Sequence, residues 1–526
     1  MFLPEIQAEV NAAKKKVLEF KGYNTISVID DGEMRDMQNL SSDEYPCLYQ
    51  RKARGLYSDS YEAPATLLAR REKLAVISGR DFYYDGIHIP QLRLSEGKKH
   101  LVAINQKICI FPDKKYFDLN NNSFGELGCE MVVSASDTVT ITNNAIEIKE
   151  GNFGGFKDGD AVEISGCITN EKNNVSAVVT LVGPLRLTFP DDTFDVPEGQ
   201  TQYIEGGRIK ILRSIPDLDF VMEYGNRLWG CNSEKNTIYS SKLGDPTNWF
   251  YFQSTSLDSY AVEVGTDGAF TGCAPYAQHL LFFKEDYIHK VYGNKPANYQ
   301  IVTAECHALE QGSERSICVV NETVFYKSRL GIMAYAGGVP ELVSQCFGNT
   351  RYRDAVAGTD GTKYYVSMAS GSKNYLFVFD LEKGLWHKED NTKVIDFAYL
   401  AGKLLYINGA DNKIYSTTAD TPIADDRAIK WMALLGDYDE YIEEKKVYSK
   451  LQMRLKLEAD SSIMVNVQFD NSGTWEQVAH IYAEKDRAVY LPIVPRRCEK
   501  FKIRIEGKGY CKIESLVREY REGSEI

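Results

Sequence analysis

Long apolar runs are absent from the sequence. No stretch approaches the ~20 consecutive apolar residues that a membrane-spanning helix needs, so we expect no span of a bilayer. The chain begins MFLPEIQAEVNAAKKK, in which no basic segment is followed by an apolar one. From this order of residues we expect no ordinary secretory signal.

Motifs for metal binding and for catalysis are also absent. The 11 cysteines are scattered, and none forms a CxxC pair, so we expect buried, reduced thiols and no structural zinc. The seven histidines form neither HExxH nor HxH, and the chain has no GxSxG, no GxxxxGK[ST] and no helix-opening GxGxxG. The sequence therefore predicts no metal, no cofactor and no enzymatic activity.

Basic residues are too few for a protein that wraps nucleic acid. Lysine and arginine number 61 against 74 aspartates and glutamates, a net charge of −13, which disfavours contacts with phosphate. Glycine and tyrosine, in contrast, are plentiful, with 40 and 33 residues. Aromatic residues favour strands and glycine favours the turns between them, so the composition predicts an all-β protein.

Residues 1–64 are expected to form a short N-terminal helix followed by an extended arm. From Glu5 to Phe20, apolar residues recur at the three- and four-residue steps that are typical of a helix. Lys14, Lys15 and Lys16 give this helix a run of charge. That run is either a solvated helix face or a docking face for a partner.

Residues 65–119 and 207–427 are expected to form a six- or seven-bladed β-propeller. A short strand, a polar turn and a second, aromatic strand recur several times. The clearest units are 39 to 53 residues apart, which is the period of four-stranded propeller blades. Each unit leaves apolar faces that only its neighbours can cover, so the ring must close or be capped. The units begin at Lys73, Lys99, Asn226, His279, Glu322, Lys363 and Gly402.

Two further β-domains are predicted. Residues 120–206 interrupt the second unit with short alternating strands and Gly-Asp and Gly-Gly turns, which indicates an inserted small barrel or sandwich. Residues 428–526 contain longer strands with strict alternation of apolar and polar residues, as in Leu451, Met453, Leu455 and Leu457. One buried face and one wet face on each strand predict a C-terminal β-sandwich.

A glycosidase is a weaker alternative, because some propellers cleave glycosidic bonds. That chemistry needs two carboxylates ~5–9 Å apart, and nothing in the sequence brings Asp85, Asp267 or Asp360 together. Two of them, Asp267 and Asp360, precede glycine, as in a hairpin turn. The segment Phe469 to Trp475 is similar to the Ser-x-Asp-x-Gly-x-Thr-Trp box of sialidases, but glycine is one place late and the box occurs once.

Three segments resemble structural proteins of tailed phages and prophages of gut Firmicutes. The first spans 20–55 and the last 507–525. The middle one, 226–252, is similar to a segment of propeller-type phage tail proteins in which W-G leads into I-Y-x-S-x-L-G-D-P-x-N-W. The structural motif here consists of Trp229, Gly230, Gly244, Asp245, Pro246 and Trp249. The marks of the first segment are Gly22, Gly32, Met37, Asn39, Leu40, Ser41, Pro46, Arg51 and Arg54.

The residues of this motif also have a direct physical interpretation. Asp245 and Pro246 set a turn, and proline ends the strand because it offers no N–H to a ladder. Trp249 then supplies a large apolar anchor, which we expect to lie between two blades. The motif therefore indicates an architecture and specifies no reaction.

The resemblance implies a non-enzymatic virion protein, made in the bacterial cytoplasm and assembled into the phage tail. The expected form is a homo-oligomer, most simply a hexamer, that builds a tail nozzle or hub beside portal, adaptor or tail proteins. DNA would pass through it during ejection without specific contacts, and the ring would help to retain packaged DNA. An acidic wall suits this passage because it repels phosphate. The alternative is a receptor- or glycan-binding tail module, in which exposed aromatic residues stack on sugars.

Overall fold

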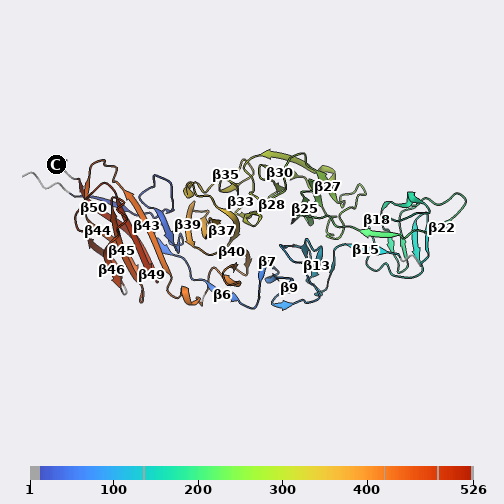
Figure 1. Cartoon of the computed structure of the whole chain (residues 1–526), viewed down its shortest axis with the longest axis horizontal. Helices are drawn as coiled ribbons and strands as arrows, with labels where there is room; N and C mark the ends of the chain where they lie inside the picture. Colours follow the sequence, from blue (N-terminus) through green and yellow to red (C-terminus); the bar gives the residue numbers. More distant parts are fainter. Residues whose placement is uncertain (1–11, 134–136, 420, 483–484, 523–526) are drawn as a thin grey trace, which may run out of the picture. The chain divides into compact units, whose positions relative to one another are not determined.

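The computed structural model describes residues 12–133, 137–419, 421–482 and 485–522, and these residues form an all-β protein (Figure 1). Within these ranges there is no α-helix, and helical geometry is limited to short 3-10 turns. The prediction of an all-β fold is confirmed. No helix in the same ranges is long and apolar enough to cross a membrane.

The predicted N-terminal helix is wrong where the structure describes it. Ala13–Val17 form the strand β1, which pairs antiparallel with β50 (Cys511–Glu522). The first residues of the predicted helix, 5–11, lie outside the described ranges. The lysines of the charge run instead alternate along a strand, where Lys14 lies 3.5 Å from Glu519. Pairing with a distant strand has overridden the local preference for a helix.

The chain forms two compact units. The N/C unit consists of Met1–Pro64 and Arg315–Ile526, and the middle unit consists of Ala65–Glu314. Each unit contains several antiparallel four-stranded sheets whose strands follow one another in chain order.

The middle unit contains four such sheets. Their strands are joined by hairpins, and the first strands of successive sheets contact one another, β11 with β24 and β24 with β28. The first sheet is β7 (Pro64–Arg70), β8 (Lys73–Ser78), β9 (Asp81–Tyr84) and β10 (Ile87–His88), and the second is β11 (His100–Ile104), β12 (Lys107–Phe111), β13 (Lys115–Asp118) and β14 (Phe124–Glu126). The third is β24 (Phe220–Tyr224), β25 (Arg227–Asn232), β26 (Thr237–Ser240) and β27 (Tyr260–Glu263), and the fourth is β28 (Gly272–Tyr276), β29 (His279–Phe283), β30 (Tyr287–Tyr292) and β31 (Gln300–Glu305).

The N/C unit contains three more antiparallel four-stranded sheets, two with their strands in chain order and one that takes a strand from the N-terminal arm. The outer strand of the last sheet is β6 (Gly55–Ser58), which comes from before the first sheet in sequence and pairs with β42 (Lys413–Ser416). The repeated four-stranded sheets and their contacting first strands are consistent with a β-propeller. The other strands are β32 (Cys318–Val320), β33 (Thr323–Lys327), β34 (Ile332–Tyr335), β35 (Glu341–Leu342), β36 (Arg353–Thr359), β37 (Lys363–Ser370), β38 (Lys373–Asp380), β39 (Leu385–Asp390), β40 (Val394–Leu400) and β41 (Lys403–Asn408).

Between β14 and β24 the chain forms two smaller sheets with a core of their own. Their side chains pack into one apolar cluster that includes Ile141, Ile146, Phe153 and Ile211. One sheet is β15 (Cys129–Val132), β23 (Lys210–Arg213), β18 (Ala161–Ser165) and β19 (Ser176–Val178). The other is β20 (Leu181–Val182), β21 (Arg186–Thr188), β17 (Ala145–Ile148), β16 (Val139–Thr142) and β22 (Gln202–Glu205). We call the segment from β15 to β23, residues 129–213, the insert.

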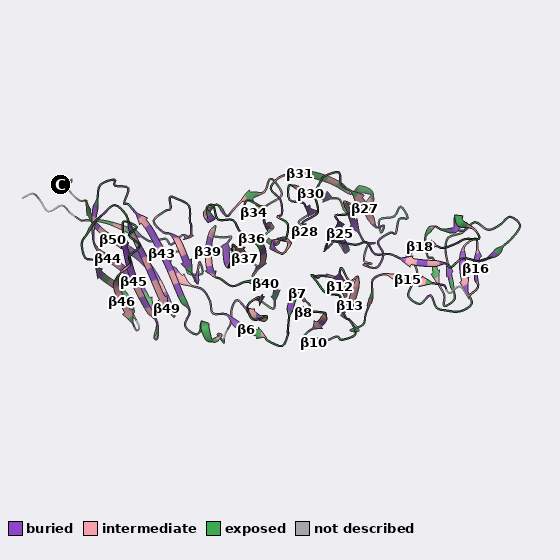
Figure 2. Ribbon diagram, in the orientation of Figure 1, coloured by how far each residue is buried: buried purple, intermediate pink, exposed green. Residues whose placement is uncertain are grey.

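The C-terminal strands form two sheets around one core, and strands of the N-terminal arm belong to both sheets. Buried and less buried residues alternate along these strands, as Figure 2 shows for β43 and β49. One sheet is β2 (Gly22–Tyr23), β3 (Glu33–Gln38), β43 (Lys430–Tyr438), β49 (Phe501–Lys508), β45 (Ser462–Phe469) and β46 (Glu476–Tyr482). The other is β4 (Leu40–Ser41), β5 (Leu48–Gln50), β50, β44 (Lys446–Leu457) and β47 (Lys485–Pro492), with β1 and β48 (Arg497–Cys498) beside them.

Candidate functional site

The first half of the predicted motif lies in the strand β25. Trp229 and Gly230 are both buried, and the Trp229 ring packs 5.1 Å from the ring of Tyr299. A Cβ atom at Gly230 would lie 2.7 Å from Leu218 Cδ1 and 2.8 Å from the carbonyl oxygen of Phe220. Glycine is therefore required here for close packing, and not for an unusual backbone angle.

The second half of the motif forms a turn that is closed by side chains. Gly244 has a φ of 73°, and Asp245 Oδ1 accepts hydrogen bonds from the backbone N–H (3.0 Å) and the hydroxyl (2.7 Å) of Thr247. Trp249 is fully buried, and its Nε1 donates to the carbonyl oxygen of Pro246 at 2.9 Å. The tryptophan lies in a cluster that includes residues of both the β11–β14 and the β24–β27 sheets.

The same turn holds the insert, and the sequence did not reveal this attachment. Asn248 is fully buried; its Nδ2 donates to the carbonyl oxygen of Gly159 at 2.7 Å, and its Oδ1 accepts from the N–H of Ala161 at 3.3 Å. Lys157 lies 2.8 Å from Asp245. Burial raises the pKa of Asp245, but Lys157 and Thr247 outweigh it and lower this pKa below its usual value. The turn of the motif therefore attaches the insert to the β24–β27 sheet.

Removing the Asn248 side chain is expected to loosen this attachment. In Asn248→Ala the buried N–H of Ala161 loses its acceptor, which costs about 1–3 kcal/mol. Hydrogen exchange measured by mass spectrometry should become faster in peptides that cover 157–163, while β25 and β26 stay protected. The exposed Asn143 of the insert provides the matched control, because Asn143→Ala removes an amide at the surface. Unchanged exchange at 157–163 in Asn248→Ala would contradict this role.

A second group of polar contacts involves residues of the segment 20–55, the first of the three that resemble phage structural proteins. Arg51 makes two hydrogen bonds to the carboxylate of Asp426, at 2.6 and 2.9 Å, and its Nε donates to Asn39 Oδ1 at 2.8 Å. The next arginine, Arg54, donates to Asp390 at 2.7 Å and is also paired with Glu389. Both arginines are buried. Because β6 begins directly after Arg54, these contacts fix the strand that completes the last four-stranded sheet.

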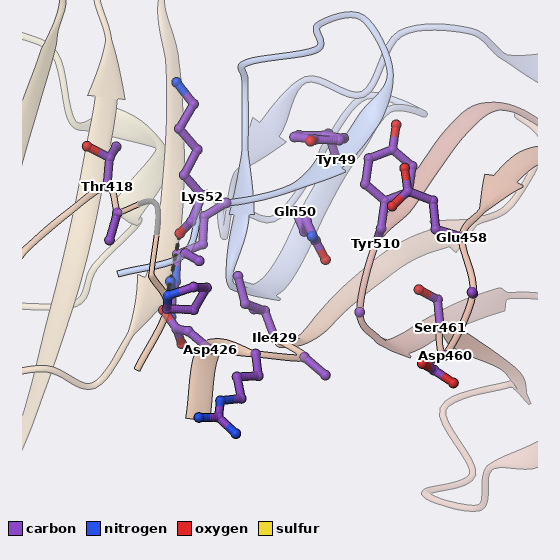
Figure 3. Close-up of a pocket in the computed structure, with 18 of the residues that line it drawn as sticks. Tyr49, Gln50, Lys52, Thr418, Asp426, Ile429, Glu458, Asp460, Ser461 and Tyr510 are labelled. Carbon is purple, nitrogen blue, oxygen red and sulfur yellow. Dashed lines mark hydrogen bonds and ion pairs between the residues drawn. The ribbon is translucent and has the colours of Figure 1, made fainter. Parts of the chain in front are cut away.

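A polar cavity of about 550 Å³ lies beside the pair of Arg51 and Asp426, within the N/C unit (Figure 3). Tyr49, Gln50 and Lys52 of the arm contribute to its wall, together with Glu458 and Asp460 from the loop after β44. Gln50 Oε1 is buried, and none of the residues that the structure describes donates a hydrogen bond to it. Charges of both signs line the cavity, and the described residues contain no group of three or more His, Cys, Asp or Glu side chains that could hold a metal.

The carboxylates considered for glycoside hydrolysis lie in different parts of the fold. Asp85 follows β9, at a φ of 55°, and is paired with Lys73 at 2.8 Å. Asp267 precedes β28, and Asp360 lies in the turn between β36 and β37, where Thr362 donates to it. The segment Phe469 to Trp475 is the turn between β45 and β46. The structure therefore places these residues in loops and turns of separate sheets.

The cysteines and two histidines are held in uncharged forms. All 11 cysteines are free thiols, five buried and six half-buried, and burial raises the pKa of Cys109 and Cys318 to about 12. His289 of β30 is buried between the hydroxyls of Thr266 (2.9 Å) and Thr303 (2.8 Å). Burial lowers the pKa of His289, and that of His387 in β39, to about 4.

Acidification is therefore expected to destabilise both units. Between pH 6.5 and 4 these two histidines are protonated in the unfolded chain but neutral in the folded one, so the unfolded state binds more protons and stability falls as pH falls. Above about pH 6.5 the contribution is fully present. The thermal midpoint of the middle unit should depend less on pH in His289→Asn than in the parent. An identical pH dependence in His289→Asn and the parent would contradict the assignment.

Comparison with known proteins assigns no family to the chain. No protein-family model and no curated protein sequence matches it. Hsv2 of Kluyveromyces lactis is similar in structure, with 12% identity, 52% of this chain and 88% of that chain covered, and a TM-score of 0.28. The endosialidase of phage phi92 is 9% identical, with 88% of this chain and 80% of that chain covered and a TM-score of 0.25. The N-terminal domain of Nup159 is 8% identical, with 76% of this chain and 98% of that chain covered and a TM-score of 0.24.

Proposed function

We propose that this chain is a non-enzymatic structural protein of a tailed bacteriophage, a ring-forming component of the tail nozzle or hub. The observation that most supports this proposal is the structural role of the residues that resemble those of phage tail proteins. Arg51 and Arg54 attach the strand that completes the last four-stranded sheet, and the turn from Gly244 to Trp249 attaches the insert. Residues that resemble those of tail proteins thus join separate β-modules into one scaffold.

In this proposal the seven four-stranded sheets outside the insert are the blades of one propeller, and about six copies of the chain form the ring. The first strands of the sheets are nearly balanced in charge, with three acidic residues (Glu223, Asp354, Asp396) and two arginines (Arg70, Arg353). The insert is more acidic. Residues 129–213 contain 13 Asp and Glu against 7 Lys and Arg, which gives a net charge of −6. We therefore assign the wall that repels DNA to the insert.

Averaged images of purified particles, labelled with an antibody against the insert, test the position of the protein. The expected result is a ring of about six copies in the tail, with the label close to the path of the DNA. Label on the capsid, or on peripheral fibres alone, would contradict a nozzle or hub.

A further inference from the structure

An aromatic cleft lies within the middle unit, beside the β24–β27 and β28–β31 sheets. It has a volume of about 870 Å³, which is in the range of small-molecule sites. The hairpin after β24, the hairpin between β28 and β29, and the loop after β30 all contribute to its wall. The rings that line it are Tyr224, Trp229, Tyr276, His279, Tyr292 and Tyr299.

The rings of the cleft are held in place by one another and by the hairpins. The hydroxyl of Tyr224 donates to the carbonyl oxygen of Ala277 at 3.1 Å, which joins the two hairpins. The rings of His279 and Tyr292 lie 4.6 Å apart with an angle of 31° between their planes. Trp229 Nε1 is buried and has no acceptor within the described part of the chain. The rings that line the cleft are therefore ordered before any ligand binds, which reduces the ordering cost of binding.

Among the described residues, no side chain with a permanent charge lines this cleft. Burial lowers the pKa of His279, so this ring is neutral at pH 7. Besides the tyrosine hydroxyls and the His279 ring, the polar side chains of the wall are the amides of Gln278, Asn294 and Asn298. Asn298 is used within its own loop, where its Oδ1 accepts from the N–H groups of Asn294 and Lys295. Gln278 and the Nδ2 of Asn294 are exposed and, among the described residues, make no hydrogen bond within the protein.

We propose that this cleft binds a neutral saccharide. Faces of aromatic rings pack on the apolar C–H faces of a sugar, and uncharged amides donate to and accept from its hydroxyls. A nucleotide, an acidic sugar or a phosphorylated lipid needs a cation for its anionic group, and the cleft offers none. The proposal does not depend on the position of the protein in a phage particle.

Saturation-transfer NMR and tryptophan fluorescence test the proposal on the full-length protein. The probes are neutral oligosaccharides of glucose, galactose, rhamnose or N-acetylglucosamine, with oligosialic acid and an oligodeoxynucleotide as anionic comparators. At least one neutral probe should bind. Tyr292→Ala and Asn294→Ala, which alter exposed residues of the cleft, should each weaken that binding about tenfold or more.

The matched control is Tyr490→Ala, because Tyr490 is an exposed tyrosine of β47 in the other unit. This variant should bind the neutral probe as the parent does, and all three variants should keep the thermal midpoint of the parent. The proposal is overturned if no neutral probe binds at millimolar concentration. It is also overturned if the anionic comparators bind more tightly in the cleft, or if folded Tyr292→Ala and Asn294→Ala keep the parental affinity.

Discussion

Replacing Glu440 by leucine is expected to lower the free energy of unfolding of the N/C unit by about 3–5 kcal/mol, the usual effect of breaking a buried ion pair. Arg518 is fully buried and donates to Glu440 at 2.8 and 3.2 Å, and its guanidinium lies 3.5 Å from the centre of the Tyr438 ring. Tyr448 also donates to Glu440, at 3.0 Å. Among the residues that the structure describes, loss of the carboxylate would leave Asp31, which is partly exposed, as the one anionic partner of the arginine.

A double variant separates two contributions to the free energy of unfolding: the net stabilisation by the ion pair, and the destabilisation by an unpaired buried charge. Glu440→Leu combined with Arg518→Met should recover most of the lost stability, because an apolar pair of similar volume often replaces a buried ion pair without loss. The exposed pair of Arg496 and Glu476 is the matched control, and Glu476→Gln should cost about 1 kcal/mol or less. Urea denaturation followed by circular dichroism measures all four proteins. Equal losses for Glu440→Leu and Glu476→Gln would contradict the role assigned to Arg518.

Trp249→Ala is expected to have a similar effect on the middle unit. The indole fills a cluster formed by two sheets, and removal of a buried tryptophan costs about 3–5 kcal/mol. The hydrogen bond from Nε1 to Pro246, which closes the turn that holds the insert, is lost as well. Trp249→Phe keeps part of the packing and should be destabilised by less.

Hydrogen exchange identifies where the effect of Trp249→Ala is located. Peptides of β11, β12 and β25 should lose protection, because their side chains surround the indole. Phe250 is the adjacent aromatic residue and is 39% exposed, so Phe250→Ala should cost about 1 kcal/mol or less. Similar losses in the two variants would show that Trp249 is not the anchor between these sheets.

Local patterns in the sequence predicted much of the fold. Alternation along Leu451, Met453, Leu455 and Leu457 places all four side chains in one core, as the structure shows. The Asp245–Pro246 turn and the buried Trp249 were also predictable, because proline, aspartate and tryptophan carry strong local preferences. These features depend on neighbours a few residues away, which a sequence displays directly.

Features that depend on distant partners were not predictable. Ala13–Val17 contains good helix formers, and only its pairing with β50, about 500 residues later, makes it a strand. The Asn248 side chain acts on the insert through Gly159 and Ala161, almost 90 residues earlier. The aromatic cleft combines strand ends and loops that are separated by up to 75 residues. No local pattern marks which tyrosines meet there.

Quantitative mass spectrometry of purified phage particles tests the central claim most directly. The proposal that this chain is a ring-forming tail protein predicts that it is present in every particle, at about six copies, and that it stays with the tail when capsids are removed. A chain that is absent from purified particles and remains a monomer in solution would contradict the proposal.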